Sequence, residues 1–471
     1  MKRWVCALMA CAALTAPAGA QPHSAQPAFG SSMSSWIDRL GKYEIQSGRA
    51  PGLAIGVIED GRIVYARGFG TANVGARVDV DPDTQFYVAG VSMQFTAAAV
   101  LMLEQDGKVK LDDKIVKYVP ELTQVAPDVT VAELLTQTSG LPDIASVPGF
   151  STDQTRQMKM ADLLAAVDKM KPSAPAGSAY ANNDLNYLVA GTIVERAAGV
   201  PLSDYLQQHV FVPLVMDRTF LSGDSGIAVS HALGYTYSPH SNSFSPARVL
   251  DRTWLFGGRG IVSTVYDLAK WDIEMPILLR VDAVRTMFTP SAATKPAQYG
   301  MGWIVDRRGG KLFTWTSGEI PGYQATNAML PDDHIAVIVL ANTDTLHGGR
   351  IAETQSIAAR ILDLVEPPAR TALDNAVISR AKEWLNRLAE RQIDRTQLTA
   401  EFSAYLTDSL VARENFAALG KLEAIVPISS ESEPGGETMY EFLVRYPHDV
   451  QYHYKFGLTK DNKIDHIELA A

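Results

Sequence analysis

Strand patterns lie at both ends of residues 53–342, and helical patterns lie between them. Near the start, apolar runs at 54–58 and 63–66 flank an Asp-Gly pair, which is typical of a hairpin turn. Near the end, residues 324–330 and 334–342 form a second pair of strand patterns. This order predicts one sheet that is built from both ends of a domain, with helices packed on it.

The helical patterns cover residues 91–106, 184–198 and about 265–275. In the first, apolar side chains at positions 95, 98, 99, 102 and 103 form the stripe expected on one face of a helix. Gly107 follows the first segment and Gly199 the second, and glycine in such a position is a stop signal for a helix. We therefore expect an α/β (α+β) domain.

A second and smaller set of patterns follows the stretch Glu366-Pro367-Pro368-Ala369, which is typical of a domain boundary. It contains helical patterns first and alternating strand patterns after them, so it predicts a small α+β domain of about one hundred residues. The helical patterns are at 378–391 and 396–406, and the strand patterns at 441–444, 451–456 and 464–468. The expected division is 21–365 for the first domain, 366–369 for the linker and 370–471 for the second domain.

The first twenty residues have the pattern of an export signal. Lys2 and Arg3 precede an apolar stretch, and Ala18-Gly19-Ala20 offers the small residues that signal peptidase reads. We expect cleavage after Ala20 and a periplasmic or secreted protein. A lipoprotein signal ending at Cys11 is the weaker alternative, because the apolar region before that cysteine is short. No later run is long and apolar enough to predict a transmembrane segment.

Composition excludes several kinds of site. Both cysteines, Cys6 and Cys11, lie in the predicted signal, so the mature chain has no disulfide, cysteine nucleophile or cysteine-ligated zinc. The formal net charge of -10 disfavours nucleic acid or an anionic membrane as partner. The nine histidines lack metal-binding spacing, and no glycine-rich phosphate loop stands between a strand and a helix. We expect neither a metal nor a cofactor.

Residues 84–96 (TQFYVAGVSMQFT) resemble the start of the active-site helix of class C β-lactamases and related penicillin-binding esterases. The resemblance covers about residues 30–365 and implies a β-lactamase/transpeptidase-like domain, an antiparallel sheet flanked by helices with a helical subdomain. The second domain resembles the small cone-shaped α+β domains, like nuclear transport factor, that follow many β-lactamase-related proteins. The other matching segments are 107–113, 134–142, 180–182, 263–271, 299–303 and 321–323.

The resemblance implies acyl transfer by a serine that opens a helix and a lysine one turn later on the same face. In this chain the serine position is Gly90 and the lysine position is Met93, so neither the nucleophile nor its base is present. The third motif of the family, a Lys- or His-x-Gly sequence on an edge strand, is Thr316-Ser317-Gly318 here and has lost its cation.

Of the other positions in the family pattern, one is replaced and two are retained. Gln137 stands where the family usually has a histidine, while Tyr180 and Asn182 match the Tyr-x-Asn motif. Ser92 lies two residues after Gly90, about 200° around a helix, and is expected to point away from the pocket.

Several groups remain that can hold a ligand. Tyr180, Asn182, Thr316, Ser317, Gly318 and Glu319 form the candidate binding set, with the amides of Gly90 and Glu319 at the oxyanion positions of the family. Trp315 and Tyr323 are candidates for stacking on a ligand, and core packing is the equal alternative for Trp315. Arg259 and Glu319 replace small residues and either line the mouth of the pocket or are simply solvated.

The sequence thus favours an exported pseudoenzyme that binds a cell-wall peptide or a small acyl or peptide ligand in its cleft. One alternative is an active hydrolase, an esterase, amidase or peptidase, that uses another nucleophile or water. A second is an interaction module that acts through the C-terminal domain. The ligand, the oligomeric state and the openness of the cleft are not fixed by the sequence.

Overall fold

The computed structural model describes most of the chain after residue 30. The described residues are 31–148, 154–155, 158–222, 231–238, 240–294, 298–308, 310–344, 353–366, 375–408, 411, 416–432, 437–447 and 450–470. The predicted signal at 1–20 lies outside them, as does the predicted linker apart from Glu366. Within the described part of the chain, no helix is long and apolar enough to cross a membrane.

The core of the first domain is an antiparallel sheet of seven strands in the order β3-β2-β1-β12-β11-β10-β9. Early strand β1 pairs directly with late strand β12, with Leu53 opposite Ala341 and Val57 opposite Val337. The prediction of one sheet built from both ends of a domain is therefore confirmed. The strands are β1 (Gly52–Glu59), β2 (Arg62–Asn73), β3 (Val78–Asp79), β9 (Ile304–Arg308), β10 (Lys311–Ile320), β11 (Tyr323–Leu330) and β12 (Ile335–Ala341).

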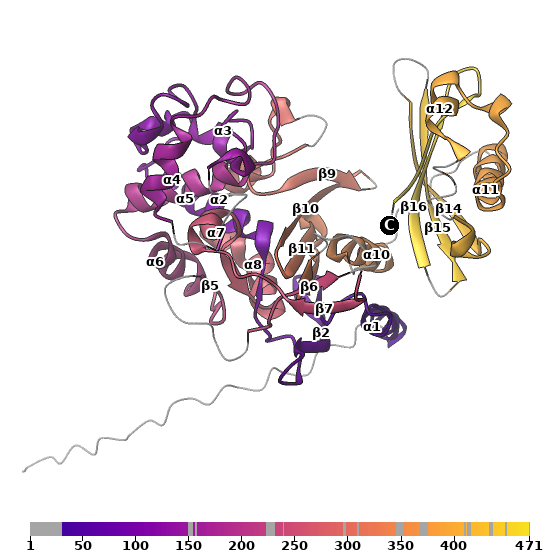
Figure 1. Cartoon of the computed structure of the whole chain (residues 1–471), viewed down its shortest axis with the longest axis horizontal. Coiled ribbons are helices and arrows are strands. Elements are labelled where there is room, and N and C mark those ends of the chain that lie inside the picture. The colour runs from indigo at the N-terminus through magenta and orange to yellow at the C-terminus, as the bar shows by residue number, and fades with distance from the viewer. Residues whose placement is uncertain are drawn as a thin grey trace, which may run out of the picture.

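Helices cover both faces of this sheet, as Figure 1 shows. Helices α1 (Ser31–Gln46) and α10 (Thr354–Val365) pack on one face, where Ile55 and Val339 are buried. Helix α8 (Val265–Leu278) packs on the other face beside Gly56, where a Cβ atom would lie 2.4 Å from Cγ1 of Val265. Because side chains alternate between the faces of a strand, a sheet covered on both sides needs continuous apolar strands such as β1 and β12.

The rest of the first domain is a helical subdomain that surrounds α2 (Ser92–Gln105). Helix α2 is apolar all round and almost wholly buried, which is the pattern of a central helix. The helices predicted at 91–106, 184–198 and 265–275 correspond to α2, α5 and α8. The other helices are α3 (Val131–Leu135), α4 (Met160–Val167), α5 (Asp184–Ala198), α6 (Leu202–Leu206), α7 (Arg252–Arg259) and α9 (Val281–Met287).

Two small sheets complete the first domain, in the orders β4-β8-β5 and β13-β6-β7. The first brings the segment before α2 beside the strand that follows α7, with Phe86 opposite Ser263. Their strands are β4 (Phe86–Tyr87), β5 (Phe220–Leu221), β6 (Tyr235–Ser238), β7 (Ser243–Pro246), β8 (Ile261–Ser263) and β13 (Thr343–Asp344).

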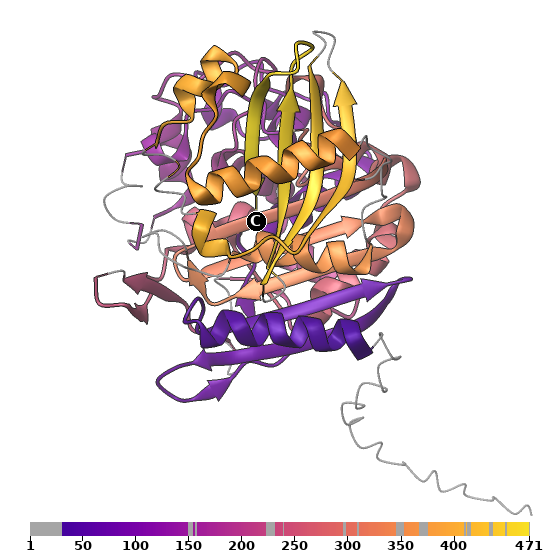
Figure 2. The same cartoon turned by 90° about the vertical axis from the view of Figure 1, so that its right-hand side faces the viewer.

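The C-terminal domain is an antiparallel sheet, β14-β15-β16-β17, with α11 and α12 packed on one face (Figure 2). Three of its strands fall where the sequence predicts them, but β14 was not predicted, since Pro427 interrupts its pattern and the pairing shifts there. The elements are α11 (Asn375–Glu390), α12 (Ala400–Tyr405), β14 (Ala424–Ser432), β15 (Thr438–Tyr446), β16 (Val450–Leu458) and β17 (Ile464–Ala470).

The helical segment predicted near 396–406 is present, but it consists of two pieces. The chain forms a short 3-10 turn (Arg395–Gln397) and then starts α12 afresh. Oγ1 of Thr399 accepts a hydrogen bond from the Phe402 amide, and this side-chain cap fixes the new helix start.

The C-terminal sheet meets α10 of the first domain through ionisable side chains. Nε2 of His453 lies 3.1 Å from Oδ2 of Asp363, and its Nδ1 lies 3.0 Å from Oε1 of Glu441. Asp363 also pairs with Arg308 at the end of β9. One imidazole thus lies between carboxylates of the two domains.

Candidate functional site

Gly90 lies in a buried helical turn, η1 (Ala89–Val91), that leads into α2. Strand β10 packs closely against it. A Cβ atom on Gly90 would lie 2.9 Å from the carbonyl oxygen of Ser317 and 3.2 Å from Cα of Gly318. Conversely, a Cβ on Gly318 would lie 2.0 Å from the Gly90 nitrogen. The two glycines therefore permit a backbone contact that a side chain at position 90 would disturb.

Two residues with side chains have left-handed backbone conformations beside this contact. Ala89, immediately before Gly90, has φ of +45°, and Gln137 has φ of +60°. Both are fully buried. Such conformations cost energy in residues with a Cβ atom and cluster at functional sites. This region therefore keeps strained backbone although the serine of the family is absent.

Met93 lies one turn into the site and is 4% exposed. Its sulfur is 3.7 Å from Nε2 of Gln137 and 3.7 Å from the hydroxyl of Tyr299. An amide N–H and a phenol O–H both donate hydrogen bonds, and a thioether sulfur is a weak acceptor. The surroundings of position 93 therefore suit a thioether better than an ammonium group, which only donates.

Gln137 is the centre of the polar network in this site. Its Oε1 accepts hydrogen bonds from the Asn183 amide at 3.1 Å and from Nδ2 of Asn186 at 2.5 Å. Its Nε2 is thereby turned toward Met93 and toward Oδ1 of Asn182, 3.3 Å away. The sequence marked Gln137 only as a replaced histidine. In the structure its side chain makes four contacts, one with the backbone amide of Asn183 and three with other side chains.

Tyr180 is half-buried, and its ring centroid lies 5.5 Å from that of Tyr299. Burial raises the pKa of Tyr180, and no cation acts to lower it. Burial likewise raises the pKa of Tyr299 well above its usual range. Both phenols therefore stay protonated at neutral pH and act as hydrogen-bond donors rather than bases.

The hydroxyls of the third motif are engaged within the protein. Thr316 is buried, and its Oγ1 donates to the carbonyl of Gly302 at 2.7 Å, away from Tyr180. Oγ of Ser317 donates to Oε1 of Gln355 at 3.3 Å. The structure thus brings Ser317 and Gly318 to Gly90, whereas the Thr316 side chain packs against the 302 loop.

Arg259 has a structural partner on each side. Its Nη1 donates to the carbonyl of Glu319, and its Nε lies 2.6 Å from Oδ2 of Asp184, the first residue of α5. The guanidinium therefore ties α7, α5 and β10 together at the rim of the site. Of the two interpretations of Arg259, simple solvation is wrong.

The remaining sequence candidates pack inside the protein. Oγ of Ser92 accepts a hydrogen bond from the Ile261 amide at 3.0 Å, which confirms that it points away from the site. Trp315 is partly buried and packs against the apolar cluster on the face of the sheet that α10 covers, which favours the packing alternative. Tyr323 is buried and donates to the Ala232 carbonyl at 2.7 Å, so it is not a platform for stacking.

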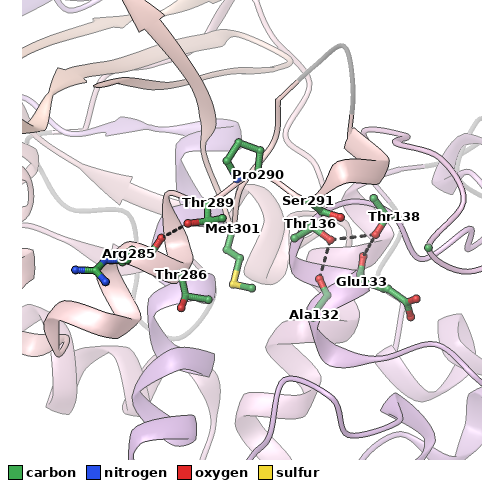
Figure 3. A pocket seen from close by; sticks show the side chains of 11 residues that line it. Ala132, Glu133, Thr136, Thr138, Arg285, Thr286, Thr289, Pro290, Ser291 and Met301 are labelled. Carbon is green, nitrogen blue, oxygen red and sulfur yellow. Dashed lines mark hydrogen bonds between the residues drawn. The ribbon is translucent and has the colours of Figure 1, made fainter. Parts of the chain in front are cut away.

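A polar recess of about 530 Å³ adjoins this network, and Figure 3 shows it from close by. One wall is α3 with the loop after it, and the other is α9 with the loop that follows it. Glu133 and Arg285 lie on opposite sides of the recess. The sequence did not predict it, and none of the six candidate binding residues lines it. The lining residues are Ala132, Glu133, Thr136, Thr138, Gly177, Arg285, Thr286, Thr289, Pro290, Ser291 and Met301.

The recess and the Gln137 network share their loops. Gln137 stands between Thr136 and Thr138, and Met301 follows the loop position of Tyr299 by two residues. In the described residues, no group of three or more His, Cys, Asp or Glu side chains is placed to hold a metal ion.

Comparison with known proteins places these features in a family. The β-lactamase family model matches residues 20–360. Unguisins hydrolase ungD' of Aspergillus campestris is 25% identical over 319 residues, 62% of this chain and 58% of that protein. Protein flp of Staphylococcus aureus is 22% identical over 328 residues, 67% of this chain and 64% of that protein. The chain thus spans less than two thirds of the length of these relatives.

Solved structures share the fold. The octameric penicillin-binding protein homologue from Pyrococcus abyssi has a TM-score of 0.62 at 20% identity, over 93% of this chain and 99% of that one. The D-amino acid amidase from Ochrobactrum anthropi SV3 has a TM-score of 0.61 at 21% identity, over 71% of this chain and 99% of that one. Because the family model matches residues 20–360, which is most of the sequence, this chain belongs to the β-lactamase family of serine hydrolases.

Proposed function

We propose that this chain is a non-acylating member of its family that binds a short peptide or a small amino-acid amide. The observation that supports this best is the setting of Met93. Gln137 and Tyr299 direct an N–H and an O–H toward its sulfur, so the position of the family base is integrated into a neutral network. A site that had only lost its lysine would leave a hole or unpartnered polar groups there.

The other parts of the acylation machinery support the same conclusion. Gly90 has no side chain to attack a carbonyl, and the approach of Ser317 and Gly318 leaves little room for one. A hydroxyl nucleophile also needs an adjacent base. The raised pKa of Tyr180 makes it a poor one at neutral pH. A site that keeps hydrogen-bonding groups for a ligand but lacks both a nucleophile and a base favours binding over covalent turnover.

The polar recess is the proposed binding place. Its walls carry the hydroxyls of Thr138 and Thr289 and, on opposite sides, the carboxylate of Glu133 and the guanidinium of Arg285. A peptide end or an amino acid derivative carries an amine and a carboxyl or amide, so it offers a complement to the guanidinium of Arg285 and to the Glu133 carboxylate, whose Oε2 already accepts hydrogen bonds from Thr130. The similar structure from Ochrobactrum anthropi SV3 is named a D-amino acid amidase and is complexed with L-phenylalanine amide.

The test is calorimetric titration of the dipeptide D-alanyl-D-alanine into the whole protein. Arg285→Gln removes the positive charge of the recess. Arg280→Gln is the matched control, because Arg280 is exposed and pairs with Asp282 outside the recess. We expect Arg285→Gln to weaken binding at least about tenfold, the usual size of a lost charge-assisted hydrogen bond. Arg280→Gln should bind as the native chain does, and the dipeptide should be recovered intact.

Two results would contradict the proposal. Hydrolysis of the dipeptide would establish the alternative of an active hydrolase that uses water or another nucleophile. Equal affinity of the native and Arg285→Gln proteins would exclude the recess as the binding place. Loss of biological function only on deletion of the segment beyond residue 366 would instead favour an interaction role of the C-terminal domain.

We also propose export and a division into domains. Residues 1–20 would be removed after Ala20, leaving a β-lactamase-related domain at 21–365, a linker at 366–369 and the C-terminal domain at 370–471 of a periplasmic or secreted protein. Terminal sequencing of the exported protein should find Gln21 first. An intact Met1 on mature protein would contradict the signal.

A further inference from the structure

A second cavity, of about 300 Å³, lies between α8, α9 and the turns that join β1 to β2 and β11 to β12. None of its lining residues belongs to the candidate site or the polar recess. Its walls are mainly apolar and include Ile58, Val284, Phe288 and Met329. Its volume is at the lower end of the range for small-molecule sites. We call it the apolar cavity.

Asp272 on α8 is the only carboxyl among the residues that line the apolar cavity. Its Oδ1 accepts a hydrogen bond from Nδ2 of Asn327 at 2.7 Å. Its Oδ2 is shielded from solvent and has no hydrogen-bond partner within the described part of the chain. A buried carboxyl oxygen without a partner is costly, so Asp272 is the lining residue whose polar group has most to gain from a new interaction.

The partner of Asp272 is itself held in place. Nδ2 of Asn327 also lies 3.4 Å from Oε1 of Gln94, and the same oxygen accepts a hydrogen bond from Nε1 of Trp271 at 3.0 Å. All three of these residues are fully buried. The polar group of the apolar cavity is therefore positioned before any ligand arrives, which lowers the entropy cost of binding.

Asp272 lacks the cation that a buried carboxylate requires. No lysine or arginine pairs with it in the described residues. Burial raises the pKa of Asp272 to about 8, and the hydrogen bond from Asn327 only partly offsets this. At neutral pH the carboxyl is therefore mostly protonated. A ligand that carries an ammonium group would favour its carboxylate form and pair with it, and the acidic net charge of the chain favours cations over anions.

We propose that the apolar cavity binds a small apolar amine, whose ammonium group pairs with Asp272 and whose hydrocarbon body packs on the walls around Phe288. Water alone fits this place poorly, because an apolar cavity offers it few hydrogen bonds. The amine forms one ion pair where water would form few hydrogen bonds, and its hydrocarbon body contacts the apolar walls. This site is independent of peptide binding in the polar recess.

The test is calorimetric titration of the full chain with 2-phenylethylamine and with its neutral analogue 2-phenylethanol. We expect the amine to bind at least about tenfold more tightly than the alcohol, as expected for one charge-assisted contact. Asp272→Asn keeps the shape of the side chain and should abolish that preference. Asp282→Asn is the control, because Asp282 is exposed on α9 and pairs with Arg280.

A second variant tests the cavity itself. Val284→Phe adds volume to the wall formed by α9 and leaves Asp272 in place, so it should abolish binding of both compounds. Equal affinity of the native chain for the amine and the alcohol would overturn the proposal, and so would unchanged amine binding by Asp272→Asn. Absence of amine binding to the native chain would overturn it as well.

Discussion

Replacing Gly90 with alanine tests the close contact between η1 and β10. The added Cβ would lie 2.9 Å from the Ser317 carbonyl oxygen and 3.2 Å from Cα of Gly318, and both neighbours are backbone atoms that cannot rotate away. Overpacking of this kind costs about 1–3 kcal/mol. The backbone at Gly90 has no positive φ, so alanine fits its conformation. Alanine also lowers the conformational entropy of the unfolded chain, which stabilises the folded state by about 0.4–1 kcal/mol. The expected net loss is about 1 kcal/mol.

Thermal unfolding measures this loss, which should lower the melting temperature of the first domain by about 1–2 °C because of its size. Gly258→Ala is the matched control, because its added Cβ would lie no closer than 3.5 Å to any neighbour and its φ is not positive. We expect that control to melt at the native temperature or above it. Equal melting temperatures for the two variants would refute the close contact at Gly90.

Three further predictions concern buried polar groups. Gln137→Leu leaves the Asn183 amide and Nδ2 of Asn186 without their acceptor, so urea titration should give a loss of about 2–4 kcal/mol. Asp272 has a pKa of about 8 in the folded protein against 3.8 as its ordinary value, so it weakens folding increasingly as the pH rises through that window. Asp272→Asn should therefore stabilise the protein by about 3–4 kcal/mol more at pH 8 than at pH 5. For Asp363 and His453, a double-mutant cycle should give a coupling free energy of about 1–2 kcal/mol.

Each of these has its own control. Gln124→Leu changes an exposed glutamine and should leave the free energy of unfolding nearly unchanged. An equal loss in both variants would contradict the central role of Gln137 in the hydrogen-bond network. A gain from Asp272→Asn that does not change with pH would contradict a raised pKa. For the exposed pair Lys455 and Glu468, the coupling free energy should be less than about 0.5 kcal/mol. An equally small coupling free energy for Asp363 and His453 would mean that their contact contributes no more than an exposed pair.

Local patterns predicted much of the fold. The hairpins around β1 and β2 and around β11 and β12 follow from apolar runs and turn residues, and α5 ends where Gly199 takes its left-handed conformation. Strand β14 was missed because Pro427 breaks its pattern, and only pairing with β15 identifies it as a strand. Secondary structure fixed by neighbours in space is not readable from a single segment.

The contacts of the candidate site were not predictable from the sequence. The assignment of Gly90 and Met93 to the serine and lysine positions of the family stays a prediction from motif order. The sequence did not show that Thr316 faces Gly302, because the register of a strand decides which face each side chain takes. The polar recess combines loops around Thr138, Gly177 and Met301, which lie far apart in the chain. Such a recess exists only after folding.

The intact mass of the protein after incubation with a penicillin, a cephalosporin and an activated ester tests the central claim most directly. With Gly90 and Met93 at the positions of the family serine and lysine, the account predicts that the mass remains unchanged with all three compounds. A relative that retains the serine and the lysine should gain the mass of the acyl group under the same conditions. A stable adduct on the native chain would contradict the account, and mapping it would identify the nucleophile.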